Sequence, residues 1–239
     1  MKDFKAALLM SHGFNDWNVM PEHSYRIYNA ARAKGVPVMI YYHQEGHGGP
    51  PPFSMMNRWF TRYLHGVEND VEKEPRAWIV REKDSRANPT AYPDYPNPNA
   101  TDVPLFITGG APATGLLTTE PSKTKKQETL VDNYSFSGST LAQAEYTDHR
   151  LMFLGPVLKQ PVHLSGIARI TIKIASSKPA ANLSVWLVAL PWNDGRNAKI
   201  TDNIITRGWA DPQNYAGIRD GKPLVPGKFY SISFDLQPD

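Results

Sequence analysis

Two short loops carry the side chains best suited to chemistry. The first reads His-Gly-Phe-Asn-Asp-Trp-Asn-Val at residues 12–19, and the second reads His-Gln-Glu-Gly-His-Gly-Gly at residues 43–49. Asp16 and His47 are the residue types of an acid–base pair, in which the carboxylate fixes the tautomer of the imidazole and stabilises the imidazolium that forms. Such a pair is two members of a nucleophilic triad, so the nucleophile is still to be found.

Simpler roles also fit these residues. Asp16 can cap the helix that follows it or hold a turn, and His47 can be an exposed loop residue between glycines. His43 and His47 have the four-residue spacing of a metal pair, but only a helix would place them on one face. The glycines around His47 argue against a helix, so we expect no metal and no cofactor.

The elements around the loops alternate between strand and helix patterns. Apolar runs at 6–10 and 36–42 precede the two loops, and between them Pro21 opens a helical pattern that ends at Gly35. An apolar stripe at helical spacing follows the second loop and ends at Gly66; its members are Met55, Met56, Trp59, Phe60, Tyr63 and Leu64. This order predicts a parallel sheet with crossover helices.

The predicted sheet brings the two loops together. Reactive groups in such sheets gather beyond the carboxyl ends of the strands, and neighbouring strands lie about 5 Å apart. Both loops follow the carboxyl end of a predicted strand. We therefore expect Asp16 and His47 to meet at one edge of the sheet.

The second part of the chain has a different pattern. Residues 83–104 are rich in Pro and Asn and are typical of a linker. Beyond it helix patterns nearly vanish, and three segments have the pattern of strands: 167–174, 183–190 and 229–236. We predict a parallel α/β part at 1–82 and an all-β jelly roll at 105–239, whose last sheet can be unfinished where the chain stops.

The composition excludes several classes of protein. The chain has 239 residues, 26 Lys and Arg against 23 Asp and Glu, and 41% hydrophobic residues, enough for a folded core. A net charge of +3 without a long basic run does not indicate a nucleic-acid partner. No cysteine is present, and no apolar run approaches the roughly 18 residues of a membrane span. The first residues lack a signal-peptide core, so a cytoplasmic location is the default expectation.

The nucleophile is missing from the sequence. A serine of the α/β-hydrolase type sits in a tight turn with Gly two residues before it, and none of the fourteen serines has Gly there. The order in that fold is Ser, Asp, His. If Asp16 and His47 are the second and third members, the serine is expected upstream of Met1.

The two loops resemble a known family. Their motifs at 12–19 and 43–47 are similar to the second half of the hydrolase domain of Xaa-Pro dipeptidyl-peptidases, serine hydrolases grouped with cocaine esterase and the α-amino acid ester hydrolases. Later stretches resemble the C-terminal jelly-roll domain of that family, which is similar to galactose-binding modules: 150–157, 164–168, 183–190, 205–209 and 226–232.

The resemblance implies a fold, roles and a substrate. It implies that residues 1–82 are the C-terminal portion of an α/β-hydrolase domain. Asp16 resembles the triad acid and His47 the triad base, with His43 and Trp17 supporting the site. It implies a serine peptidase that releases X-Pro dipeptides from peptides with proline at the second position, with a homodimer as one option and no nucleic-acid or membrane partner. Because the serine turn has no match here, this chain alone is expected to be inactive.

Two other functions stay open. The first is an ester or amide acylase of the cocaine esterase type, which shares the triad and the jelly roll. The second is a non-catalytic module that stacks sugars on aromatic rings, for which the candidates are Trp186, Trp192, Trp209, Tyr215 and Tyr230. We expect these rings to fill a sandwich core instead.

Overall fold

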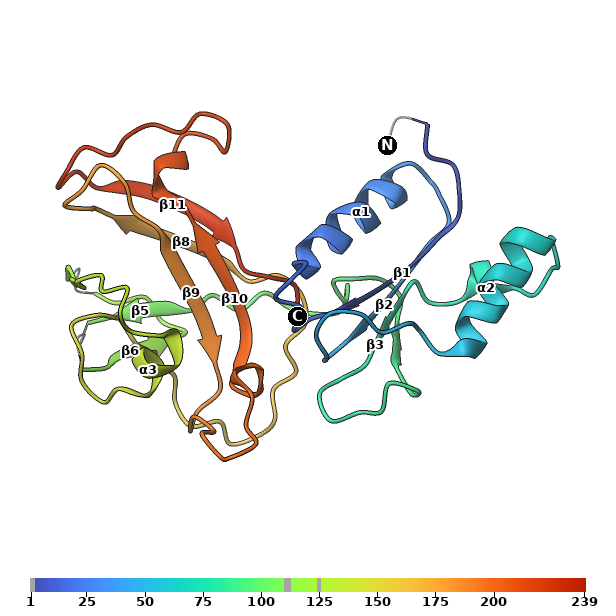
Figure 1. The fold of residues 1–239 in the computed structure, drawn as a ribbon, viewed down its shortest axis with the longest axis horizontal. Helices are drawn as coiled ribbons and strands as arrows, with labels where there is room; N and C mark the ends of the chain where they lie inside the picture. Colours follow the sequence, from blue (N-terminus) through green and yellow to red (C-terminus); the bar gives the residue numbers. More distant parts are fainter. Residues whose placement is uncertain (1–2, 110–112, 124–125) are drawn as a thin grey trace. The chain divides into compact units, whose positions relative to one another are not determined.

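The computed structural model describes residues 3–109, 113–123 and 126–239 and divides into two compact units (Figure 1). The first unit comprises residues 1–99, 165–188 and 204–239, and the second comprises residues 100–164 and 189–203. The first unit therefore joins the α/β part with strands from the region predicted as a jelly roll. The predicted domain boundaries at residues 82 and 105 stay a prediction.

The first unit contains a four-stranded sheet in the order β1-β2-β3-β4. Strands β1 (Leu8–Gly13), β2 (Val38–His43) and β3 (Ala77–Ile79) are parallel, and β4 (Thr90–Tyr92) is antiparallel to β3. All of β2 is buried, as expected for the central strand of a covered sheet. The predicted α/β arrangement is confirmed, and the Pro- and Asn-rich segment contributes β4 to it.

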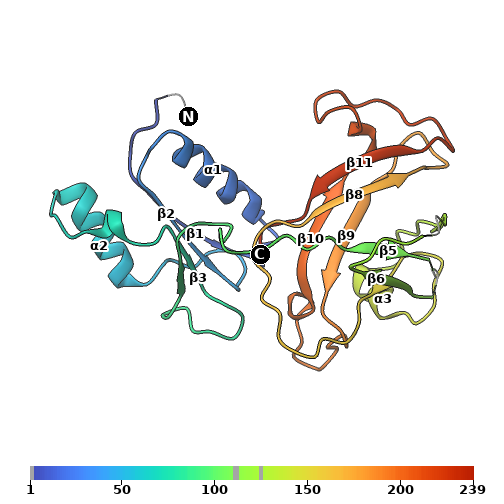
Figure 2. The ribbon, with the colours of Figure 1, turned by 180° about the vertical axis from the view of Figure 1, so that it is seen from behind.

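Two helices cover opposite faces of this sheet. Helix α1 (Pro21–Ala33) packs on the face that carries Ile40 and Tyr42, whereas α2 (Phe53–His65) packs its Trp59 on the face that carries Met39. The alternation of side chains along β2 produces the two cores. Figure 2 shows the two helices flanking the strands from the reverse side.

Helices α1 and α2 end at the two glycines that the sequence indicated. Gly35 (φ 68°) comes directly after the α1 cap residue, and Gly66 (φ 71°) caps α2 in a left-handed conformation. The predicted apolar stripe of α2 is only partly buried, since Phe60 is 48% and Leu64 73% exposed. Trp59 is the member that enters the core.

The first unit also holds two antiparallel strand pairs. β8 (Arg169–Ile174) pairs with β11 (Tyr230–Asp235), and β9 (Leu183–Val188) pairs with β10 (Ile204–Ala210). The pairs are linked where the Gln237 N–H donates to the Arg207 carbonyl (2.7 Å) and the Thr206 hydroxyl donates to the Gln237 carbonyl (2.7 Å). The predicted strands are thus present, and their jelly-roll topology stays a prediction.

The second unit is built from short elements. β6 (Gly115–Thr118) pairs antiparallel with β5 (Phe106–Thr108) and parallel with β7 (Phe153–Leu154). Helix α3 (Gly138–Gln143) is capped by Ser137, whose side chain accepts the Thr140 N–H. Within the described part of the chain, no helix has the length and apolar character needed to span a membrane.

Candidate functional site

The parallel register of β1 and β2 places both loops at one sheet edge. Gly13, the last residue of β1, is the register partner of His43, the last residue of β2. The Phe14 N–H donates to the His43 carbonyl (2.8 Å), and the Asn15 side chain donates to the Gln44 carbonyl (2.8 Å). These bonds fix the first loop against the second.

Asp16 is buried at the centre of this edge, with 2% of its surface exposed. Its Oδ1 accepts the backbone N–H groups of Asn18 (2.8 Å) and Val19 (2.9 Å), and its Oδ2 lies 2.9 Å from His47 Nδ1. Asp16 therefore holds a turn and contacts the imidazole at the same time. It does not cap α1, whose cap residue Met20 makes no side-chain bond.

The carboxylate of Asp16 is held in its charged form. Burial alone would raise the pKa of Asp16, but the hydrogen bonds from Val19, His47 and Asn18 outweigh it and lower the pKa below its usual value. The His47 side chain is 60% exposed. With Nδ1 on the carboxylate, the opposite nitrogen of this ring, Nε2, is available for a proton transfer.

A second imidazole contacts the same carboxylate, and the sequence analysis did not single it out. His12 Nε2 lies 3.2 Å from Asp16 Oδ2 and 2.9 Å from the Val19 carbonyl, while its Nδ1 lies 2.5 Å from the Ser24 hydroxyl. Because both partners of Nε2 are acceptors, Nε2 carries the proton and the Ser24 hydroxyl donates to Nδ1 in the neutral ring. His12 thus contacts the same carboxylate oxygen, Oδ2, as His47 does.

His43 lies beneath the second loop and is fully buried. Its Nδ1 accepts the Glu45 N–H (3.2 Å), and burial lowers the pKa of the ring, so the neutral form that this bond requires is favoured. His43 ends a strand and His47 lies in a loop, which removes the helical geometry of a metal pair. No group of three potential metal ligands occurs among the residues that the structure describes. A supporting role for His43 stays a prediction.

Trp17 meets side chains from the far end of the chain. Its ring lies 4.0 Å from the Arg207 guanidinium carbon and makes an edge contact with Trp186 at 6.2 Å. Arg207 Nη2 also donates to the backbone carbonyl of Asp16 (2.9 Å). The stretch 205–209 resembles the family, but the sequence pattern assigned Arg207 no role at the site, because its position there depends on the pairing of β9 and β10.

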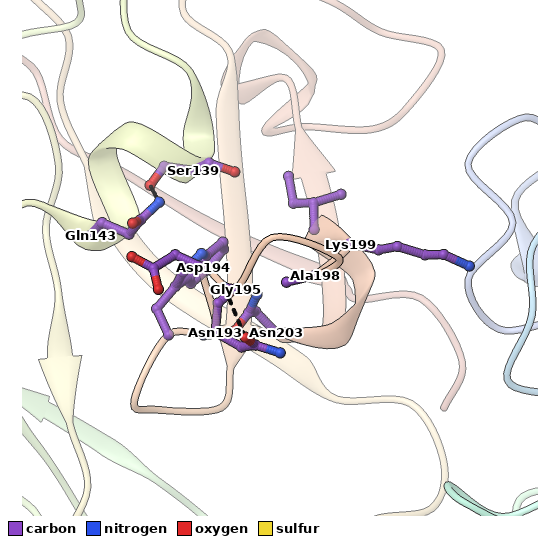
Figure 3. A pocket seen from close by; sticks show the side chains of 10 residues that line it. Ser139, Gln143, Asn193, Asp194, Gly195, Ala198, Lys199 and Asn203 are labelled. Carbon is purple, nitrogen blue, oxygen red and sulfur yellow. Dashed lines mark hydrogen bonds between the residues drawn. The ribbon is translucent and has the colours of Figure 1, made fainter.

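The aromatic residues considered as candidates for stacking sugars do not form one group in the structure. Trp186 contacts Trp17, and Tyr215 and Tyr230 contact each other at 4.4 Å, all in the first unit. Trp192 lines a pocket of about 130 Å³ in the second unit, between α3 and residues 193–203 (Figure 3). Asn193 and Asn203 are hydrogen-bonded to each other in its wall.

The comparisons with known proteins agree with the geometry. Residues 69–239 match the family described as the X-Pro dipeptidyl-peptidase C-terminal non-catalytic domain, and residues 1–69 match the prolyl oligopeptidase family. A Rhodopirellula baltica protein named as an Xaa-Pro dipeptidyl-peptidase is 63% identical over 235 residues, which are 98% of this chain and 38% of that protein. The chain therefore spans about two fifths of the length of this relative.

Solved structures show the same fold at low identity. An aminopeptidase from a marine-sediment Thaumarchaeota archaeon matches with a TM-score of 0.66 and 16% identity, over 98% of this chain and 45% of that one. An α-amino acid ester hydrolase matches with a TM-score of 0.62 and 14% identity, over 95% and 44% of the two chains. These structures show the fold alone. The first family match covers more than half of the chain and shows that the chain belongs to the X-Pro dipeptidyl-peptidase family.

Proposed function

We propose that this chain carries the acid and the base of a serine peptidase that removes X-Pro dipeptides from peptide N-termini. The observation that carries the proposal is the 2.9 Å contact between the buried Asp16 carboxylate and Nδ1 of the exposed His47 ring. A buried carboxylate that orients an accessible imidazole is the arrangement that general-base activation of a hydroxyl requires.

The proposed reaction follows the serine triad scheme. His47 Nε2 takes the proton of a serine hydroxyl, whose oxygen attacks the carbonyl after a penultimate proline. The tetrahedral intermediate collapses to an acyl-enzyme as His47 protonates the leaving amine, and water activated by His47 then releases the dipeptide. Asp16 keeps the proton of the neutral ring on Nδ1 and stabilises the imidazolium.

The serine belongs, in this proposal, to polypeptide upstream of residue 1. Two observations support it: no serine here has the preceding glycine of a nucleophile turn, and the Rhodopirellula baltica relative is much longer than this chain. The chain alone is therefore expected to be inactive. A homodimer belongs to the same proposal and rests on the family likeness alone. The cytoplasmic location that the sequence suggested as a default is kept as part of the proposal.

The peptidase branch is favoured over the esterase branch by the family match and by the name of the 63% identical relative. The proposed substrates are accordingly peptides with proline at the second position. An ester or amide acylase is the alternative, since an α-amino acid ester hydrolase shares the fold.

The first test uses the full-length protein with Ala-Pro nitroanilide and, in parallel, simple esters. Asp16→Asn should lower kcat on the order of 10⁴-fold, because an amide cannot hold the productive tautomer. His47→Ala should abolish measurable turnover. His23→Ala, an exposed histidine of α1, is the matched control and should keep wild-type kcat.

Near-normal hydrolysis of the anilide by His47→Ala would show that His47 is not the base. Turnover of esters without turnover of the anilide would assign the protein to the acylase branch.

A further inference from the structure

Arg207 is a buried cation beside the acid–base pair. It lies on β10 with 1% of its surface exposed. Its Nη2 donates to the Asp16 carbonyl (2.9 Å), and its guanidinium carbon lies 4.0 Å from the ring centre of Trp17 and 5.7 Å from that of Trp209. The guanidinium is thus held by one backbone carbonyl of the catalytic loop and by two indole rings.

Such a cation is costly to bury if packing is its sole purpose. Burial lowers the pKa of Arg207 to about 10, although the Asp16 carboxylate opposes this shift, so the group stays charged at neutral pH. Its Nε has no hydrogen-bond partner within the part of the chain that the structure describes. An apolar side chain of similar volume would fill the same space without the cost of desolvating a charge.

Arg207 contacts two consecutive residues of the first loop, Asp16 and Trp17. The carbonyl that it binds belongs to Asp16 itself, and the ring on which it stacks belongs to the next residue. The charged and titratable groups that surround the Asp16 carboxylate are His12, His47 and Arg207. Arg207 is the permanent cation among them, and it favours the ionised carboxylate.

We propose that Arg207 is a positioning residue for the Asp16–His47 pair, which it serves by fixing the backbone of Asp16 and the ring of Trp17. The inference rests on the proposed function. It assigns a task in catalysis to the region that the matching family description calls non-catalytic. Strand β10 thereby becomes part of the framework of the site.

The test compares two substitutions in the full-length protein, using Ala-Pro nitroanilide. Arg207→Met keeps most of the volume and removes the charge and the hydrogen bond, whereas Arg207→Lys keeps the charge and removes the planar stack. Arg169→Met is the control, because Arg169 lies exposed on β8 and pairs with Asp235. The measurements are kcat, KM and thermal unfolding.

A positioning role predicts a specific pattern. Arg207→Met should lower kcat on the order of 10²-fold with KM nearly unchanged, since a small misplacement of the loop acts on the chemical step. Arg207→Lys should lower kcat less, because it keeps a cation that can donate to the Asp16 carbonyl.

Other outcomes overturn the inference. If Arg207→Met lowers the unfolding temperature but leaves kcat unchanged, Arg207 is a packing residue only. If Arg207→Met fails to fold, Arg207→Lys decides, and a wild-type kcat in that variant rejects the positioning role. Loss of activity in Asp16→Asn and His47→Ala, with full activity in Arg207→Met, would reject this inference and keep the proposed function. Full activity in the two dyad variants would reject the proposed function itself.

Discussion

The two oxygens of the Asp16 carboxylate have different partners. Oδ1 binds the backbone N–H groups of Asn18 and Val19, and Oδ2 lies between His12 and His47. The structural and the chemical explanations of this residue are therefore not alternatives, because the turn that Asp16 holds also orients the carboxylate. The same contacts make the stability of the protein sensitive to the charge of Asp16.

This charge gives a pH prediction. The pKa of Asp16 is lowered in the folded protein, so its ionisation stabilises the fold above the unfolded pKa of about 3.9. The contribution is lost as the pH falls through the lower, folded pKa. The free energy of unfolding of the wild type should approach that of Asp16→Asn as the pH falls from about 5 to 2, measured by urea denaturation. A difference that stays constant over this range would contradict the shift.

At the scale of elements, the close approach of two loops depends on Gly13. A Cβ at this position would lie 2.1 Å from the Glu45 carbonyl oxygen and 2.5 Å from that of Gly46. The loop after β1 and the loop after β2 touch through backbone atoms, which leaves no room for a side chain. Gly13 therefore sets the separation of Asp16 and His47.

Gly13→Ala is expected to push the two loops apart. The clash is with backbone atoms, so we expect a loss of more than about 2 kcal/mol in the free energy of unfolding, together with a large fall in kcat. Gly35→Ala is the matched control: its φ of 68° costs about 1 kcal/mol, but nothing lies within 4 Å of the added Cβ. Its kcat should equal that of the wild type. Equal effects of the two substitutions would show that steric contact at Gly13 is unimportant.

At the scale of the molecule, the first unit is held together by contacts between distant segments. The Tyr95 hydroxyl is shared between the carbonyls of Asp239 (2.9 Å) and Gly166 (3.3 Å), and its ring packs on Phe14 and Tyr42. The proline-rich segment that contains Tyr95 thus connects the α/β sheet with the later strands.

Removal of the Tyr95 hydroxyl tests how much this connection contributes to stability. Tyr95→Phe should cost about 0.5–1.5 kcal/mol of unfolding free energy, because the hydrogen bond to two half-buried carbonyls is lost while the ring packing is kept. Tyr134→Phe is the control, since Tyr134 is 97% exposed and should change stability by less than about 0.5 kcal/mol. Thermal and urea unfolding of both variants would measure the difference. A neutral Tyr95→Phe would mean that ring packing alone makes the connection.

The sequence by itself determined the α/β order and one pair of site residues. Apolar runs, helix-ending glycines and the carboxyl-end rule are local signals, and they sufficed to place Asp16 and His47 at one sheet edge. The burial of α2 was less well predicted, because helical spacing alone cannot tell which apolar residues, such as Phe60 and Leu64, meet the core.

Only the tertiary structure decided the surroundings of that pair. His12 contacts Asp16 through Nε2, and Arg207 reaches Asp16 through the pairing of β9 with β10. The His12–Asp16 contact spans only four residues, but it forms because the turn at Asp16 brings the carboxylate back to the ring. The Arg207 contact leaves no periodicity or spacing in the sequence, since it depends on strand register between segments far apart along the chain. Local chemistry therefore indicated the proposed acid and base, whereas the contact from Arg207 forms only when the whole unit folds.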